Sequence, residues 1–119
     1  MDLIIGGAYQ GKLEYAKKRF GLSDEDIFFC EESVIINTKA RCVCGLERYV
    51  LACVKEGAVP RSDFNEDAVL IGREISSGVV PADPLTRRYR EAYGRYMQEL
   101  GGKAQSVTRL FCGIPQKLK

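Results

Sequence analysis

The stretch from Asp2 to Lys12 reads DLIIGGAYQGK, and Leu13 follows it. Its apolar run ends at two glycines, which is typical of a buried strand that enters a turn. Residues 6–12 match the pattern G-x-x-x-x-G-K between that strand and a predicted helix. In this pattern the glycines let backbone amides surround a phosphate, and the lysine ammonium binds its terminal oxygens. The stretch therefore predicts a phosphate-binding loop, with a simple chain reversal and a solvated Lys12 as the alternative.

The residue after the lysine separates phosphate binding from catalysis. Phosphoryl transfer requires Mg²⁺, which a serine or threonine hydroxyl at this position normally helps to hold. Leu13 has no oxygen that could coordinate a metal. The sequence thus predicts a nucleotide site and leaves its catalytic competence open. The candidate nucleotide-binding residues are Gly6, Gly7, Ala8, Tyr9, Gln10, Gly11, Lys12 and Leu13.

The rest of the chain alternates apolar runs with helical periodicity. A helix is predicted at 11–20, buried strands at 27–30 and 68–72, and a last strand at 107–112. Apolar residues at helical spacing predict one long helix over 38–56, with Thr38 as its N-cap, and another from Asp83 to about Leu100. This β-α-β-α-β-α-β order predicts a small parallel sheet in a three-layer α/β/α arrangement, as in P-loop NTPases.

Composition narrows the classes of function. A chain of 119 residues suits a single nucleotide-binding domain over 1–119. The net charge of +2 gives no basic excess that would predict a nucleic acid or an anionic membrane as partner. The apolar runs are too short to span a bilayer and the N-terminus lacks the features of a leader, so we expect a cytoplasmic protein.

Two residue types bear on the chemistry. The chain contains no histidine, which excludes mechanisms that use a Ser-His or Cys-His pair or a phosphohistidine. The cysteines number five and do not form a disulfide pattern, so we expect reduced thiols. Cys42 and Cys44 make a C-x-C pair, but no second pair lies at zinc-site spacing, and small buried residues are the simpler interpretation.

Charged residues follow several of the predicted strands. Ligands of parallel sheets bind beyond the carboxyl ends of the strands. Glu31 follows the second predicted strand and is the candidate ligand of Mg²⁺, while Glu74 follows the third and is a candidate catalytic residue beside Lys12 and Glu31. Each has a simpler interpretation as a solvated carboxylate or an ion-pair partner. Three arginines are candidates for contacts to phosphate or substrate: Arg73, Arg87 and Arg90.

Motifs near both ends of the chain point to a family. Residues 73–81 read REISSGVVP, residues 87–95 read RRYREAYGR and residues 113–119 read GIPQKLK. With the loop, they resemble the adenosylcobinamide kinase/adenosylcobinamide-phosphate guanylyltransferase family of cobalamin biosynthesis, whose loop reads G-G-A-R-S-G-K-S. The family's other motifs read N-E-V-G-x-G-I-V-P, R-x-x-R-x-x-x-G-R and G-I-P-x-K-x-K. The resemblance implies ATP or GTP with Mg²⁺, a cobinamide as acceptor, and a homo-oligomer to which Tyr89, Tyr93 and Tyr96 contribute if they do not belong to the core.

The departures from the family pattern concern the chemistry. The histidine that becomes guanylylated in the family is absent, and Tyr9, Gln10 and Leu13 replace an arginine and two serines of the loop. Arg73 stands where the family has asparagine. Two hypotheses remain: a weak nucleotide-dependent kinase of the cobinamide kinase type, and a catalytically inactive relative that acts as a binding or regulatory protein. A kinase for another small alcohol is a third and weaker interpretation.

Overall fold

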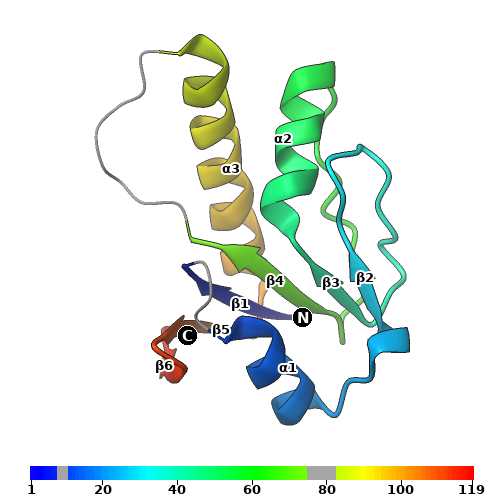
Figure 1. The fold of residues 1–119 in the computed structure, drawn as a ribbon, viewed down its shortest axis with the longest axis vertical. Helices are drawn as coiled ribbons and strands as arrows, with labels where there is room; N and C mark the ends of the chain where they lie inside the picture. The colour runs from blue at the N-terminus through cyan, green and yellow to red at the C-terminus, as the bar shows by residue number, and fades with distance from the viewer. Residues whose placement is uncertain (8–10, 75–82) are drawn as a thin grey trace.

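The structure is a computed structural model that describes residues 1–7, 11–74 and 83–119 (Figure 1). The strands are β1 (Asp2–Gly6), β2 (Ile27–Phe29), β3 (Cys42–Cys44), β4 (Val69–Arg73), β5 (Ser106–Phe111) and β6 (Ile114–Lys117). The helices are α1 (Lys12–Phe20), α2 (Leu46–Glu56) and α3 (Pro84–Lys103), with a short 3-10 helix, η1, at Asp24–Asp26. The six strands form one sheet in the order β2-β3-β4-β1-β5-β6.

The sheet lies between two helical layers. α1 covers one face, and α2 and α3 lie side by side on the other (Figure 1). Successive side chains of β1 alternate between the two cores, since Leu3 packs with α2 and α3 while Ile4 packs with α1. The first five strands in the sheet order, from β2 to β5, are parallel to one another, and β6 runs antiparallel to β5. The predicted three-layer α/β/α fold is therefore confirmed.

The predicted helix over 38–56 is wrong in its first half. Cys42 to Cys44 form β3, which pairs with β2 on one side and β4 on the other. Gly45 then adopts a left-handed conformation with φ of 92°, and α2 begins at Leu46. Thr38 is buried in a turn and caps no helix. The buried strand and the buried face of α2 follow each other with a spacing that also fits a single helix, so the periodicity alone could not separate them.

The C-terminal strand prediction was incomplete. β5 ends at Phe111, and Cys112 and Gly113 form a tight turn with φ of 51° and 73° before β6. Positive φ at both central residues is the geometry of a two-residue hairpin. β6 contains Pro115, which an edge strand tolerates because one side of its backbone has no strand to pair with. The last strand, predicted at 107–112, is therefore the first half of a hairpin.

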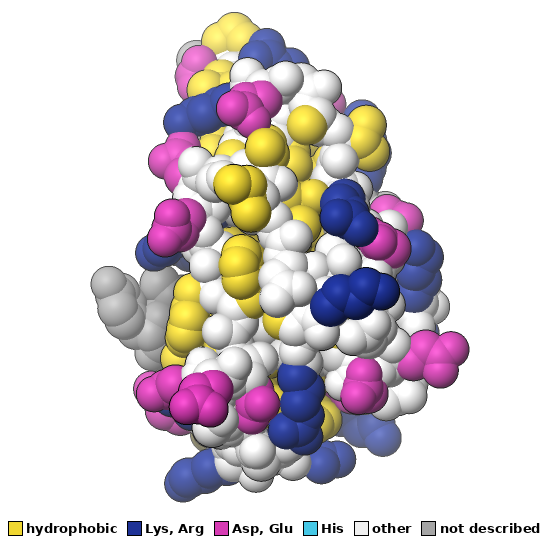
Figure 2. All heavy atoms as spheres, turned by 90° about the vertical axis from the view of Figure 1, so that its right-hand side faces the viewer, with side chains coloured by type: hydrophobic (Ala, Val, Ile, Leu, Met, Phe, Trp, Pro, Cys, Tyr) yellow, Lys and Arg dark blue, Asp and Glu magenta, His cyan; other side chains and the backbone are white. Residues whose placement is uncertain are grey.

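The second strand also differs from its prediction. The run 27–30 was expected to be buried on both faces, but β2 is the first strand in the sheet order and Phe29 is 49% exposed. Figure 2 shows the side of the molecule nearest β2, where charged side chains of both signs are mixed with apolar ones. This face therefore carries no field of a single sign. None of the described helices is long and apolar enough to cross a membrane.

Two tyrosine hydroxyls tie α3 to distant segments. Tyr93 donates a hydrogen bond to the carbonyl oxygen of Arg73 at 2.6 Å, and Tyr96 donates one to that of Arg61 at 2.7 Å. Both rings are buried, so the core interpretation of these tyrosines is correct. Tyr93 reaches Arg73 because Gly72 has no side chain: a Cβ there would lie 2.7 Å from the Tyr93 hydroxyl oxygen. The end of β4 is thus positioned by α3.

We expect Gly72→Ala to destabilise the protein by about 1–3 kcal/mol, because the added methyl group overlaps the Tyr93 hydroxyl and the end of the Met97 side chain. The matched control is Gly94→Ala on α3, where a Cβ would have nothing within 4 Å. Because alanine favours a helix interior over glycine, this control is expected to stabilise by about 0.5–1 kcal/mol. Urea denaturation followed by circular dichroism measures both changes. Equal effects of the two substitutions would contradict the role given to Gly72.

Candidate functional site

The loop predicted from the sequence lies between β1 and α1. Gly11 adopts a left-handed conformation with φ of 83°, and α1 begins at Lys12. The Lys12 ammonium donates a hydrogen bond to the carbonyl oxygen of Gly7 at 2.7 Å. Gly6 is buried, and a Cβ there would lie 2.8 Å from the carbonyl oxygen of Leu110. Three predicted residues, Ala8, Tyr9 and Gln10, lie outside the described residues.

Two helices begin at one pocket on the carboxyl edge of the sheet. The pocket has a volume of about 270 Å³. It is lined by Gly11, Lys12, Leu13, Glu14, Cys44, Gly45, Glu47 and Ile71. We call it the loop pocket. Gly11 precedes α1 and Gly45 precedes α2, and neither glycine has a side chain to cap its helix. In the first turn of α2 the N–H of Arg48 donates to the carbonyl oxygen of Gly45 at 3.0 Å, while no side chain caps the first amides of either helix. These uncapped amides and the positive ends of both helix dipoles are therefore available to an anion.

Cys44 ends β3 inside the loop pocket. Burial raises the pKa of its thiol to about 11, the negative charge of Glu47 adds to the increase, and the positive charge of Lys12 opposes it. Both charges thus act on the same thiol, one from α2 and one from α1. The thiol is neutral at physiological pH and leaves the phosphate chemistry of the pocket to Lys12 and the backbone amides.

Glu47 is a charged pocket residue that the sequence analysis did not assign to the site. It lies in the first turn of α2, and its carboxylate oxygen Oε1 accepts a hydrogen bond from the backbone N–H of Arg73 at 2.9 Å. This bond joins the start of α2 to the end of β4. Residue 47 was placed in the middle of a predicted long helix, so nothing suggested that it followed a strand end. A strand assigned to 42–44, with Gly45 as its turn, would have revealed it.

Glu31, the predicted magnesium ligand, does not line the loop pocket. It is exposed and follows β2, and two strands separate β2 from β1 in the sheet order. Three steps between neighbouring strands place β2 roughly 14 Å from β1. The adjacent carboxylate of Glu32 forms an ion pair with Lys55 of α2. The metal-binding role of Glu31 stays a prediction that this geometry does not favour.

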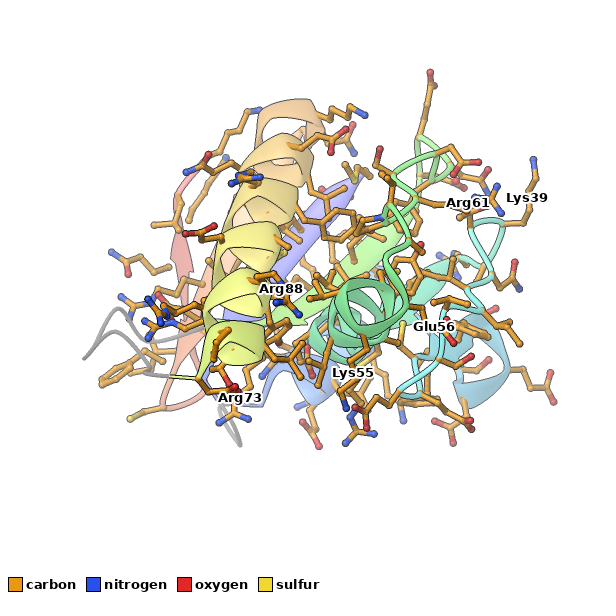
Figure 3. The ribbon with its side chains drawn as sticks, turned by 90° about the horizontal axis from the view of Figure 1, so that it is seen from above. Lys39, Lys55, Glu56, Arg61, Arg73 and Arg88 are labelled. Atoms are coloured by element: carbon orange, nitrogen blue, oxygen red, sulfur yellow. The ribbon has the colours of Figure 1, made fainter. Side chains whose placement is uncertain are left out.

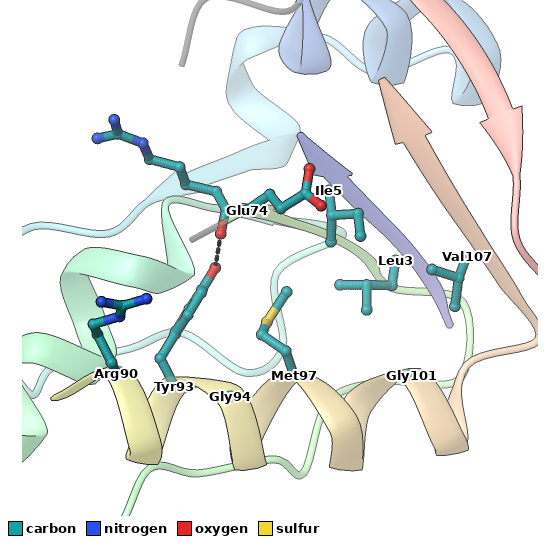
Figure 4. A pocket seen from close by; sticks show the side chains of 10 residues that line it. Leu3, Ile5, Glu74, Arg90, Tyr93, Gly94, Met97, Gly101 and Val107 are labelled. Carbon is teal, nitrogen blue, oxygen red and sulfur yellow. Dashed lines mark hydrogen bonds between the residues drawn. The ribbon is translucent and has the colours of Figure 1, made fainter. Parts of the chain in front are cut away.

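Three other predicted residues surround a second cavity of about 390 Å³ beneath α3 (Figure 4). These residues are Arg73, Glu74 and Arg90. Apolar side chains of β1, β5 and α3 form the rest of the wall, including Leu3, Met97 and Val107. Glu74 accepts a hydrogen bond from Nε of Arg109 at 2.9 Å, while the side chain of Arg73 points away from the sheet (Figure 3). These side chains line a different cavity from Lys12, although the backbone N–H of Glu74 donates a hydrogen bond to the carbonyl oxygen of Gly6 at 2.7 Å.

The remaining predicted positions lie at the ends of elements. Arg87 is exposed in the first turn of α3, where Asp83 caps the helix by accepting hydrogen bonds from two backbone amides. It lines neither of the two cavities. Most of the motif at 73–81 lies outside the described residues. The hairpin turn at Gly113 lies against the loop, since a Cβ on Gly11 would be 3.8 Å from the Cα atom of Gly113.

No group of three or more acidic, cysteine or histidine side chains gathers around a common point in the described parts of the chain. A metal ion in the loop pocket would therefore have to arrive with a nucleotide. Mg²⁺ is commonly bound in this way, through one or two carboxylates, phosphate oxygens and water. The pocket meets this requirement because Lys12 and two uncapped helix starts surround a space that also includes the carboxylate of Glu47.

Comparison with known proteins assigns the chain to a family. The family described as cobinamide kinase / cobinamide phosphate guanyltransferase matches residues 33–118. The chain belongs to this family. The match begins after the loop at 6–12 and covers β3 to β6, so it supports the sequence motifs at 87–95 and 113–119 independently of the loop.

A curated relative shares part of this sequence. The bifunctional adenosylcobalamin biosynthesis protein CobU of Escherichia coli (strain K12) is 37% identical over 51 residues, which are 43% of this chain and 28% of that protein. The matched stretch thus spans less than a third of the relative.

The partly buried environment of Cys44 predicts slow alkylation. Because the pKa of its thiol is raised to about 11, less thiolate is present at neutral pH than for an ordinary cysteine, and the reaction rate with iodoacetamide should rise about tenfold per pH unit from 7 to 10. Mass spectrometry of peptides measures the rate at each cysteine. Cys112, exposed in the hairpin turn, is expected to react first. Labelling of Cys44 at neutral pH as fast as that of Cys112 would contradict this picture of the pocket.

Proposed function

We propose that this chain binds the triphosphate of ATP or GTP in the loop pocket, as a phosphotransferase of the cobinamide kinase type. The observation that carries the proposal is the convergence of two uncapped helix N-termini and Lys12 on one cavity at the strand ends. Family membership adds the acceptor, a cobinamide hydroxyl, and a place in cobalamin biosynthesis. A homo-oligomer, implied by the same resemblance, stays a prediction.

The described residues supply positioning and positive charge. Lys12 exchanges its hydrogen bond with the Gly7 carbonyl for terminal phosphate oxygens, and the first-turn amides of α1 and α2 donate to the phosphate chain. Magnesium bound with the nucleotide would neutralise charge that develops during phosphoryl transfer. Holding donor and acceptor in line provides most of the acceleration in reactions of this class. Guanylyl transfer through histidine does not occur on these 119 residues, which include none.

One residue favours the alternative of an inactive relative that binds without catalysis. Leu13 lines the loop pocket and packs against the core on the α1 face of the sheet, where a phosphate loop normally presents a hydroxyl to magnesium. Binding of phosphates by Lys12 and the backbone amides survives this replacement. The alternative therefore shares the nucleotide site with the first proposal and differs in turnover.

Calorimetric titration of ATP and GTP, with and without Mg²⁺, tests the proposal. We expect at least one nucleotide to bind the unmodified chain with a micromolar Kd, which corresponds to a binding free energy of about −8 kcal/mol. Lys12→Ala should weaken the binding by about tenfold or more, because the lysine makes charge-assisted bonds to the phosphates. The matched control is Lys18→Ala, which removes a lysine from the exposed part of α1 and should leave the affinity unchanged.

Binding that is lost in Lys12→Ala and kept in Lys18→Ala, together with phosphorylation of cobinamide, would support the kinase. The same binding without turnover would support the inactive relative. If neither nucleotide binds, or if both lysine substitutions weaken binding equally, the loop pocket is not the nucleotide site.

A further inference from the structure

We propose that Glu47 is the protein carboxylate that holds the nucleotide-bound Mg²⁺ in this chain. The inference rests on the proposed function, namely that the loop pocket receives a nucleoside triphosphate. Glu47, on α2, thereby replaces Glu31, the magnesium ligand that we expected from the sequence. The inference also explains how a chain with leucine after the lysine can retain a metal-dependent site.

Position in the pocket singles out the candidates. Among the described residues, the carboxylates that line the loop pocket are Glu14 of α1 and Glu47 of α2. Mg²⁺ bound to a nucleotide needs only one or two protein ligands, since phosphate oxygens and water complete its octahedron. A single carboxylate in the loop pocket therefore supplies enough protein ligands. Glu31 follows β2, which two strands separate from β1, and it could bind this metal only if β2 moved.

Orientation favours Glu47 over Glu14. The Glu47 carboxylate is held in place because Oε1 accepts the backbone N–H of Arg73 at 2.9 Å, which leaves further lone pairs on both oxygens for water or metal. Its negative charge acts on Cys44, which lines the same pocket. Glu14 is exposed on α1, and its charge acts on Lys17, one turn further along that helix. A fixed carboxylate loses less side-chain freedom when it binds a ligand than a mobile one does.

The other groups in the pocket make poor ligands for magnesium. Leu13 has no donor atom, and Cys44 is a neutral thiol because burial raises its pKa to about 11. Mg²⁺ is a hard cation that prefers oxygen to sulfur. Glu47 is thus the remaining oriented oxygen ligand on the α2 side of the pocket, which the start of α1 also lines.

The test compares three isosteric substitutions, Glu47→Gln, Glu14→Gln and Glu31→Gln, in the full chain. The amide oxygen of glutamine can still accept the Arg73 N–H, so the Glu47 variant keeps the bond that joins α2 to β4. Each protein is saturated with the β,γ-imido analogue of the nucleotide that the unmodified chain binds. Mn²⁺ is then titrated, and the bound fraction is measured by electron paramagnetic resonance, with Mg²⁺ as competitor. Circular dichroism verifies that each variant is folded.

We expect Glu47→Gln to lower the affinity for Mn²⁺ by about tenfold or more, the scale seen when a group that supports a metal is removed. Its metal-free nucleotide affinity should stay equal or increase, since a negative charge near the phosphates disappears. Glu14→Gln and Glu31→Gln should match the unmodified chain. This pattern, with metal affinity and nucleotide affinity changing separately, would not arise from a merely structural role.

Two results would overturn the inference while leaving the proposed function intact. The first is an unchanged Mn²⁺ affinity in Glu47→Gln, and the second is a larger loss in Glu31→Gln or Glu14→Gln. If the unmodified chain binds no nucleotide, the proposed function fails, and this inference fails with it. The first titration therefore distinguishes the two failures before any glutamate is changed.

Discussion

The site depends on two helix starts whose backbone amides have no side chain to satisfy them. Gly11 before α1 and Gly45 before α2 both adopt left-handed conformations, with φ of 83° and 92°. A serine, threonine or aspartate at such a position would cap the helix with its own oxygen, as Asp83 does for α3. Glycine leaves the amides to solvent or to an anion. The same chain thus closes one helix start and keeps two open, and the two open ones lie at the same pocket.

The parallel sheet brings these helix starts together. β1 and β3 are separated only by β4, and a helix follows each of them after a short turn, so α1 and α2 begin at the same edge from opposite faces. The end of β4 lies between them and is positioned from two sides. Glu47 accepts the amide of Arg73, and Tyr93 donates to the carbonyl oxygen of the same residue. The end of β4 at Arg73, two residues beyond the pocket residue Ile71, is therefore held by both α2 and α3.

The sequence predicted the parts of the fold that have strong local signals. The loop, the strands at 2–6 and 69–73 and the capped helix at 84–103 each combine an apolar pattern with a glycine, a proline or a capping side chain. The three-residue strand β3 has no such signal. Its buried residues continue the spacing of α2, and a single glycine marks the boundary between them. The hairpin β5-β6 was not predicted because its turn is Cys112-Gly113, which is not a standard hairpin dipeptide. In addition, Pro115 weakens the strand pattern of β6.

The candidate site could be predicted only as far as the topology was right. Lys12, Gly11 and Leu13 line one pocket because they are contiguous in the sequence and follow β1 directly. Whether residues of other elements lie near the loop depends on the order of the strands in the sheet, and that order was not predicted from the sequence. A sheet without β3 would place the end of the second strand next to β4, where Glu31 would approach the loop. Inserting β3 moves Glu31 one strand further away and supplies Glu47 instead.

Leu13 connects the loop to the core in a way that a hydroxyl would not. It lines the pocket and also packs against the cluster that joins α1 to β4 and β5. Burying a leucine side chain contributes about 1.5–3 kcal/mol when it is complete, whereas a serine there would lose that contact and gain a magnesium ligand. On α1, Ala16 is buried, and Leu13 is one of three partly buried side chains, with Tyr15 and Phe20, that pack against this cluster. Leucine at residue 13 therefore contributes to the attachment of α1 rather than to metal coordination, and under the proposed function a nucleotide-bound metal would have to be held from the other side of the pocket.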